Sequence, residues 1–234
     1  MTIFRTIVFV AAAAGFMAGL ALSAIQIFST VPLIQRAESF EKAGDKSAAP
    51  AAHAHAPGTP AHADTAWQPQ DGLERLAYTV ASNIVGAIGF ALLLVALSEI
   101  AGGIASWRQG IYWGLGGFAS FTLAPSLGLP PELPGMPSAE LLDRQIWWLA
   151  TAALTSCGLA MIVFLRSLLA SFAGIGLIVA PHVIGAPHPA SFESAVPHLL
   201  AHQFAVAAIV SGFVFWILLG IVAGAVRRRL TPGG

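Results

Sequence analysis

Histidine is the residue type in this sequence with the most specific chemistry. Neutral imidazole is the commonest side-chain ligand for transition metals, and the chain has seven histidines. Three lie in an Ala/Pro-rich stretch and four flank the last two apolar segments: His53, His55 and His62, then His182, His188, His198 and His202. This distribution predicts that the chain binds metal.

The main candidate site lies around the last apolar segment. His198 and His202 are four residues apart, which places both imidazoles on one face of a helix. The preceding stretch 181–189 carries His182 and His188 among prolines and glycine, so we expect it to be irregular and to fold back toward that pair. Glu193 adds a carboxylate nearby. The alternative is that these are solvated histidines at a membrane interface.

A second, weaker candidate is the group His53, His55 and His62. Residues two apart in an extended chain point the same way, so His53 and His55 are spaced for loose sharing of an ion outside the membrane. Chance enrichment in a solvated linker explains the same residues equally well.

Long apolar segments must position these histidines. The chain is 56% hydrophobic and 9% charged, against about 25% charged residues in soluble domains. Each uncharged run is long enough for the roughly 20 residues of a membrane-spanning helix. The runs are 6–35, 76–98, 109–131, 145–165, 167–192 and 194–226. We therefore predict an all-α integral membrane protein with a six-helix transmembrane bundle.

A five-span arrangement is the alternative, because 146–186 is nearly continuous apolar sequence broken by Arg166. Six spans require a turn at roughly 165–171. Prolines recur near the outer ends of the odd-numbered helices, at Pro32, Pro125 and Pro181. This recurrence suggests three helical hairpins in tandem. The simpler explanation is that prolines often end helices.

Arginine placement predicts the orientation. With six helices, one side of the membrane receives both termini and the short loops. That side carries Arg5, Arg108, Arg166 and the Arg227–Arg229 triplet. This side is expected to be cytoplasmic, with both termini inside, in a multi-pass protein of the bacterial inner membrane. The chain reads as one transmembrane domain, 1–234, in which 36–72 is a largely flexible external His/Ala/Pro-rich loop. All seven histidines then lie outside.

Few polar residues fall inside the apolar segments. Glu99 and Asn83 are the candidate pathway residues, since intramembrane polar groups often mark ion routes. Glu99 alternatively sits at the interface. Gln26, Thr122, Thr151 and Thr155 are polar but neutral positions within the spans.

Several functions are disfavoured. We find no nucleophile–base pair or carboxylate pair, so no enzyme is expected, and no basic cluster suggests nucleic acid. No Walker-type motif is present, and we expect no permanently bound cofactor. A divalent cation entering along the membrane potential gains about 4.6 kcal/mol per 100 mV, which can drive uptake without nucleotide.

At several motifs the chain resembles the CbtA family of predicted cobalt transporters. The specific parts are the proline-rich loop and the Pro-His segment. The motifs are Val31-Pro32-Leu33-Ile34, Arg75-Leu76-Ala77-Tyr78, Trp113-Gly114-Leu115-Gly116-Gly117, Leu127-Gly128-Leu129-Pro130-Pro131-Glu132-Leu133-Pro134-Gly135, Arg144-Gln145 with Trp147-Trp148, and Pro181-His182 through Pro187-His188-Pro189.

The resemblance implies an integral membrane protein for cobalt uptake linked to cobalamin synthesis, with a small single-span, histidine-bearing CbtB partner. Co2+ is therefore the expected transported ion. Imidazole and carboxylate ligands alone leave Ni2+ and Zn2+ open. Association with membrane lipid is expected, and a homo-oligomer is compatible with the sequence. The competing function is a non-transporting metal-binding scaffold or sensor that acts through a partner.

Overall fold

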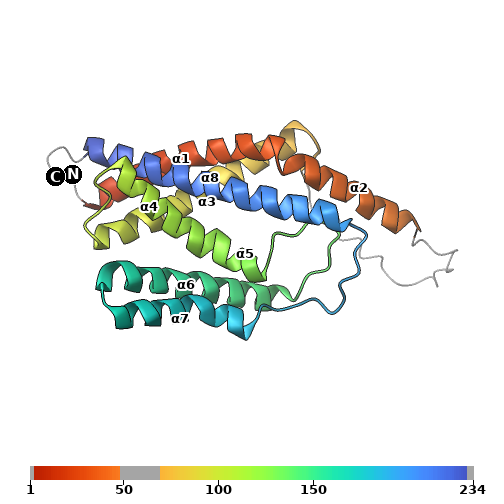
Figure 1. The fold of residues 1–234 in the computed structure, drawn as a ribbon. Coiled ribbons are helices and arrows are strands. Elements are labelled where there is room, and N and C mark those ends of the chain that lie inside the picture. The colour runs from red at the N-terminus through yellow and green to blue at the C-terminus, as the bar shows by residue number, and fades with distance from the viewer. Residues whose placement is uncertain (1–2, 48–68, 231–234) are drawn as a thin grey trace, which may run out of the picture.

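The computed structural model describes residues 3–47 and 69–230, in which the regular secondary structure is helical and no strand occurs. Figure 1 shows the helices running roughly along one axis. Their bounds are α1 (Ile3–Phe28), α2 (Val31–Ser47), α3 (Leu73–Ile100), α4 (Trp107–Phe118), the π-helix η1 (Ala119–Leu123), α5 (Ala124–Gly128), α6 (Leu141–Leu165), α7 (Leu168–Ile184) and α8 (His198–Leu230).

Four of these helices are long and apolar enough to cross a membrane: α1, α3, α6 and α8. Helix α7 has 17 residues, which at 1.5 Å per residue is about 25 Å. Helices α4, η1 and α5 follow one another without a break and together cover 107–128. The all-helical, membrane-type architecture is thus confirmed.

The chain reverses at Arg166, inside the predicted turn region. Arg166 adopts a left-handed conformation with φ 48° and ends α6. Ser167 then caps α7, because its side chain accepts a hydrogen bond from the Ala170 backbone N–H at 3.1 Å. Helices α6 and α7 therefore form a hairpin and not one long helix (Figure 1).

Glycines set the closest helix contacts. A Cβ at Gly220 would lie 2.0 Å from the carbonyl oxygen of Gly110, so α4 and α8 touch backbone to backbone. A Cβ at Gly158 would lie 2.5 Å from the Gly174 carbonyl oxygen, which pairs α6 with α7. At Gly15 it would meet the backbone of Ile88, which pairs α1 with α3.

These pairs correct the tandem-hairpin arrangement. The most extensive contacts join α1 with α3, α4 with α8, and α6 with α7. The first tandem hairpin is present, but α4 packs mainly on α8, which lies far along the chain. The glycines of α8 explain the difference, because Gly220 and Gly224 accept the backbone of α4 and of Ser106 just before it.

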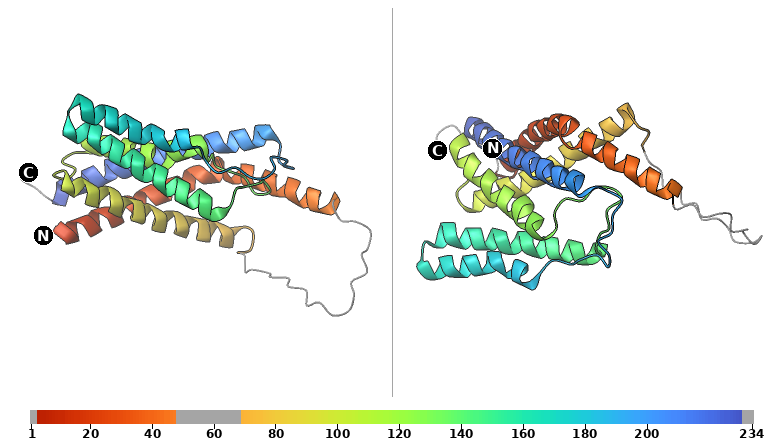
Figure 2. Two further views of the ribbon diagram at one scale, coloured as in Figure 1. Left: turned by 90° about the horizontal axis from the view of Figure 1, so that it is seen from below. Right: turned by 45° about the vertical axis from the view of Figure 1, so that its right-hand side comes forward.

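The end of the bundle where α8 begins is closed by α2 and two long loops, 129–140 and 185–197 (Figure 2). Ala37 of α2 is buried against Leu133, Val196 and Leu200. Two ion pairs tie this end together: Glu38 with Arg75, and Glu132 with Arg144 at 2.9 Å. Helix α2 occupies the first part of the loop predicted over 36–72, and 48–68 lie outside the described residues.

The opposite end is fixed by an ion pair between α3 and α8. Arg227 donates hydrogen bonds to both carboxylate oxygens of Glu99, at 2.5 and 3.0 Å, and to the Ile104 carbonyl at 3.2 Å. The side chains of Arg227 and Glu99 are only 14% and 19% exposed. Gly103, with φ +80°, leaves room for the guanidinium group.

Replacing Gly220 by Ala should separate α4 from α8. The added methyl group has backbone as its neighbour, so we expect a loss of about 1–3 kcal/mol in the free energy of unfolding. Thermal unfolding in detergent micelles measures this loss of stability. Gly116→Ala is the control, because a Cβ there meets nothing within 4 Å. Equal melting temperatures for the two variants would contradict the backbone contact.

Replacing Glu99 by Gln should destabilise the bundle because it removes the negative charge that faces the Arg227 guanidinium in a mostly buried position. Removal of one partner from a buried ion pair typically costs about 3–5 kcal/mol. The thermal unfolding of Glu99→Gln, Arg227→Gln and the double variant measures the coupling, and exposed Arg228→Gln is the control. Additive losses in the double variant would show that the pair contributes nothing.

Candidate metal site

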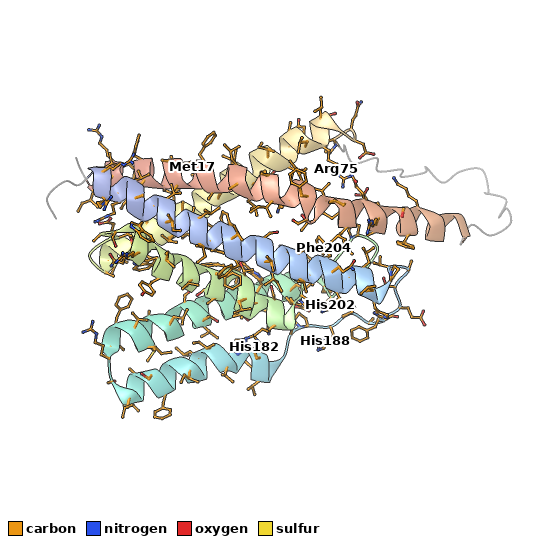
Figure 3. All side chains as sticks on the ribbon, turned by 45° about the horizontal axis from the view of Figure 1, so that its top comes forward. Met17, Arg75, His182, His188, His202 and Phe204 are labelled. Carbon is orange, nitrogen blue, oxygen red and sulfur yellow. The ribbon has the colours of Figure 1, made fainter. Side chains whose placement is uncertain are left out.

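The four described histidines lie at one end of the bundle. They lie near the C-terminal end of α7, on the following loop and in the first turns of α8, opposite the end where α1 begins and α8 finishes (Figures 1 and 3). The prediction that they lie on one side of the membrane stays a prediction, and the structure places His182, His188, His198 and His202 at one end of the bundle. His53, His55 and His62 lie outside the described residues.

The predicted His198–His202 pair lies on a helix. Helix α8 begins at His198, and the Pro197 carbonyl accepts backbone hydrogen bonds from Leu200 and Ala201. Both imidazoles are therefore one turn apart at the helix start. Both residues are exposed on the surface of the bundle.

His188 and Glu193 lie on the irregular loop 185–197 and are also exposed. The His188 ring lies 6.3 Å from that of Phe192, measured between centroids. Among residues 3–47 and 69–230, no three His, Cys, Asp or Glu side chains gather at one point. The structure thus brings these groups to one end without assembling them into a finished coordination sphere.

His182 has a different environment from the other three. The stretch 181–184 was expected to be irregular, but Pro181 and His182 belong to the last turn of α7 and the loop starts at Gly185. A proline so close to the end of a helix removes only one helical hydrogen bond, so the turn survives. The His182 ring lies edge-on to Trp147 with 5.8 Å between centroids, and its Nε2 is buried.

Trp147 holds the end of α7 against α6. Its indole N–H donates a hydrogen bond to the Pro181 carbonyl at 3.2 Å. A Cβ at Gly128 would meet the Trp147 ring and Ala186, so the end of α5 also reaches this point. Helices α5, α6 and α7 therefore meet at His182 and fix its position. The position of His188 is set only by the loop 185–197.

The two predicted pathway residues differ in their environment. Glu99 is held by Arg227 at the opposite end of the bundle. Asn83 lies among the helices, where its amide nitrogen donates to Ser23 Oγ at 3.0 Å and to Gln26 Oε1 at 2.7 Å. Its carbonyl oxygen is not used in these bonds.

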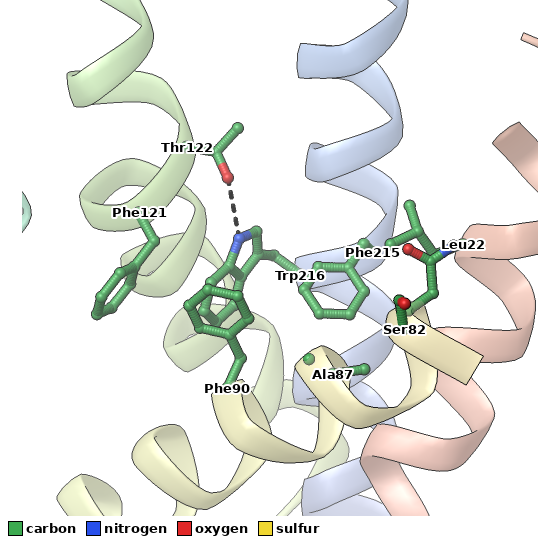
Figure 4. A pocket seen from close by; sticks show the side chains of 10 residues that line it. Leu22, Ser82, Ala87, Phe90, Phe121, Thr122, Phe215 and Trp216 are labelled. Atoms are coloured by element: carbon green, nitrogen blue, oxygen red, sulfur yellow. Dashed lines mark hydrogen bonds between the residues drawn. The ribbon is translucent and has the colours of Figure 1, made fainter. Parts of the chain in front are cut away.

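Asn83 lines a cavity of about 230 Å³ between α1, α3, η1 and α8. Figure 4 shows its aromatic wall, in which the Trp216 indole N–H donates to Thr122 Oγ1 at 3.1 Å. Phe90 packs edge-on to Trp216 with 5.2 Å between centroids. We did not predict this cavity, because its aromatic residues come from three segments far apart in the sequence.

Comparison with known proteins adds one finding. The sequence model of a family described as "Probable cobalt transporter subunit (CbtA)" matches residues 4–228. No curated protein and no solved structure shows significant similarity to the chain. The match includes every described helix except the first residue of α1 and the last two of α8. With nearly its whole length matched, and with a fold of apolar helices, the chain belongs to the CbtA family of probable cobalt transporter subunits.

Proposed function

We propose that this chain takes up Co2+ across the bacterial inner membrane, and that histidines at the outer end capture the ion. The observation that carries the proposal is the exposed group His188, His198 and His202 at one end of a bundle whose family is that of a cobalt transporter subunit. Imidazole nitrogen suits Co2+, Ni2+ and Zn2+ alike, so the choice of cobalt rests on the family.

The proposed topology has six spans, formed by α1, α3, the continuous α4–η1–α5 segment, α6, α7 and α8. The reversal at Arg166 supports it, because α6 and α7 are separate antiparallel helices. The ends bearing Arg5, Arg108, Arg166 and Arg227 gather on one side of the bundle (Figure 2). By the positive-inside rule that side is cytoplasmic, with both termini inside.

Capture uses ligands from two elements. His198 and His202 present two nitrogens from one turn of α8, and loop 185–197 brings His188 and the Glu193 carboxylate. Since these groups are not gathered in the structure, the loop closes on the start of α8 when the ion binds. His53, His55 and His62 bind metal weakly outside the membrane and so raise its local concentration.

Inside the membrane, Asn83 and its cavity are the proposed passage, and Glu99 lies at the cytoplasmic exit. The membrane potential supplies the driving force. No permanently bound cofactor is needed, and the chain acts with a CbtB-type single-span subunit. Self-association is compatible with the same arrangement.

The topology predicts the labelling of single cysteines by a membrane-impermeant maleimide. In a Cys157→Ala background, Ser191→Cys on loop 185–197 should be labelled in intact cells. Ser167→Cys at the α6–α7 turn should be labelled only after the cells are opened. Equal labelling of both positions in intact cells would contradict six spans with this orientation.

The triple variant His188→Ala, His198→Ala and His202→Ala should lower the affinity of capture and leave passage intact. We expect the half-saturating cobalt concentration to rise about tenfold, a typical loss when metal-site groups are removed, with the maximal rate unchanged. Uptake of radiolabelled cobalt by cells measures both quantities. Gln203→Ala, exposed on the same turn, is the control. An unchanged half-saturating concentration would reject these histidines as the capture site.

The second candidate function is a metal-binding scaffold or sensor that works through another protein. The word "subunit" in the family description favours it, because it implies a partner. Liposomes containing the purified chain, alone or with the partner subunit, separate the two functions. Cobalt entry that requires only this chain supports the transporter, and competition by nickel and zinc then tests the choice of metal.

A further inference from the structure

Three polar atoms stand out inside the membrane-spanning part of the structure. Thr151 Oγ1, Thr155 Oγ1 and His182 Nε2 are buried and have no hydrogen-bond partner among the described residues. Thr151 is 0% exposed and Thr155 is 2% exposed. A buried polar group without a partner costs about 1–3 kcal/mol, so three such atoms in one region require an explanation.

Other helical hydroxyls in this protein behave differently. Ser156, on the same helix α6, donates to the Ala152 carbonyl at 2.8 Å, one turn back. Ser23 and Ser211 do the same with Gly19 and Ala207. This bond within the helix satisfies a hydroxyl in an apolar surrounding. The hydroxyls of Thr151 and Thr155 do not make it, so they are available to something between the helices.

The two threonines lie on the face of α6 that meets α7. Trp147, Thr151, Thr155 and Gly158 are spaced four, four and three residues apart, which forms one stripe along the helix. Trp147, at the outer end of the stripe, bonds to the Pro181 carbonyl, and Gly158, at its inner end, contacts Gly174. The hydroxyls therefore lie between two points where α6 and α7 touch.

Backbone interruptions occur on both helices that flank α6. Pro181 has no N–H, so the Leu177 carbonyl one turn earlier lacks its helical donor. In the other flanking segment, the π-helix η1 ends just before buried Pro125. Neither helix is unwound here, but a carbonyl without its helical donor, such as that of Leu177, resembles the free carbonyls that discontinuous helices supply to ion sites in transporters.

From this arrangement we infer a second metal site within the membrane, between α6 and α7, that takes a partly hydrated divalent transition-metal ion. His182 Nε2 binds the ion directly. The Thr151 and Thr155 hydroxyls accept hydrogen bonds from water molecules that the ion retains. This inference rests on the proposed function, because it gives the captured ion its next position inward.

The chemistry of the groups fits such an ion. Imidazole is a good inner ligand for Co2+, Ni2+ or Zn2+, whereas a neutral hydroxyl is better suited to hold coordinated water. Retained water lowers the cost of bringing a double charge between apolar helices. A single strong protein ligand holds the ion loosely enough for it to leave, as passage requires.

The test measures binding of Co2+ alone to the purified full-length chain in detergent micelles. All histidines except His182 are replaced by Ala in a background variant, which removes the outer site. Equilibrium dialysis and the visible absorption of bound Co2+ report on what remains. We expect the background variant to bind cobalt, and the further change His182→Gln to abolish that binding.

In the same background, Thr151→Val with Thr155→Val should weaken cobalt binding about tenfold, as loss of groups around a metal ligand typically does. Valine keeps the shape of threonine, so the variant should fold. Ser156→Ala is the matched control on α6, because its hydroxyl is already bonded to Ala152. In the otherwise unchanged protein, the valine pair should lower the maximal uptake rate and leave the half-saturating concentration unchanged.

A background variant that binds no cobalt would overturn the inference. Equal affinity in the valine and Ser156→Ala variants would also overturn it, since the hydroxyls would then hold only structural water. Failure of the proposed function looks different: the triple variant of His188, His198 and His202 would take up cobalt like the unchanged protein. Binding at His182 is read without transport, so the two failures are separable.

Discussion

Close backbone contact at glycine holds this structure together. Lipid surrounds the helices with hydrocarbon as apolar as their own side chains, so burial of apolar surface gives little reason for one helix to choose another. Helices then associate where small residues let their backbones approach. Gly110 and Gly220 join α4 to α8, Gly158 and Gly174 join α6 to α7, and Gly15 and Gly19 join α1 to α3.

These contacts divide the bundle into a tightly joined group and a hairpin beside it. Helix α1 packs on both α3 and α8, and α8 packs on α4, so these four helices form one group. The α6–α7 hairpin meets the group mainly through η1 and α5 (Figure 1). The His182 imidazole, whose Nε2 is buried, and the hydroxyls of Thr151 and Thr155 all belong to the hairpin, whereas His198 and His202 belong to α8.

Much of the fold was predictable because hydropathy and charge act locally. The apolar runs correspond to helices, and Arg166 ends α6 where a charged residue interrupts an apolar run. The pairing of α4 with α8 was not predictable, since several helices carry glycine stripes and their spacing does not identify a partner. Helix α2 was also missed over 36–47, because its contacts with Leu133 and Leu200 involve segments far along the chain.

The candidate site was predictable in composition and only partly in geometry. The spacing of His198 and His202 follows from helix periodicity, and α8 begins there. The direction of a side chain depends on its neighbours in space, so sequence grouped His182 with three exposed histidines although Trp147 packs against it. Thr151 and Thr155 were visible as polar positions, but only the structure shows that their hydroxyls lack partners.

The short length of α7 has a further consequence for the membrane itself. In the proposed six-span topology α7 crosses the membrane, yet at about 25 Å it is shorter than the roughly 30 Å hydrocarbon core. Local thinning of the bilayer is one way in which a membrane accommodates a short span. With such thinning, the low-dielectric layer beside the proposed site between α6 and α7 is narrower than elsewhere, which lowers the electrostatic cost of an ion there before any ligand contributes.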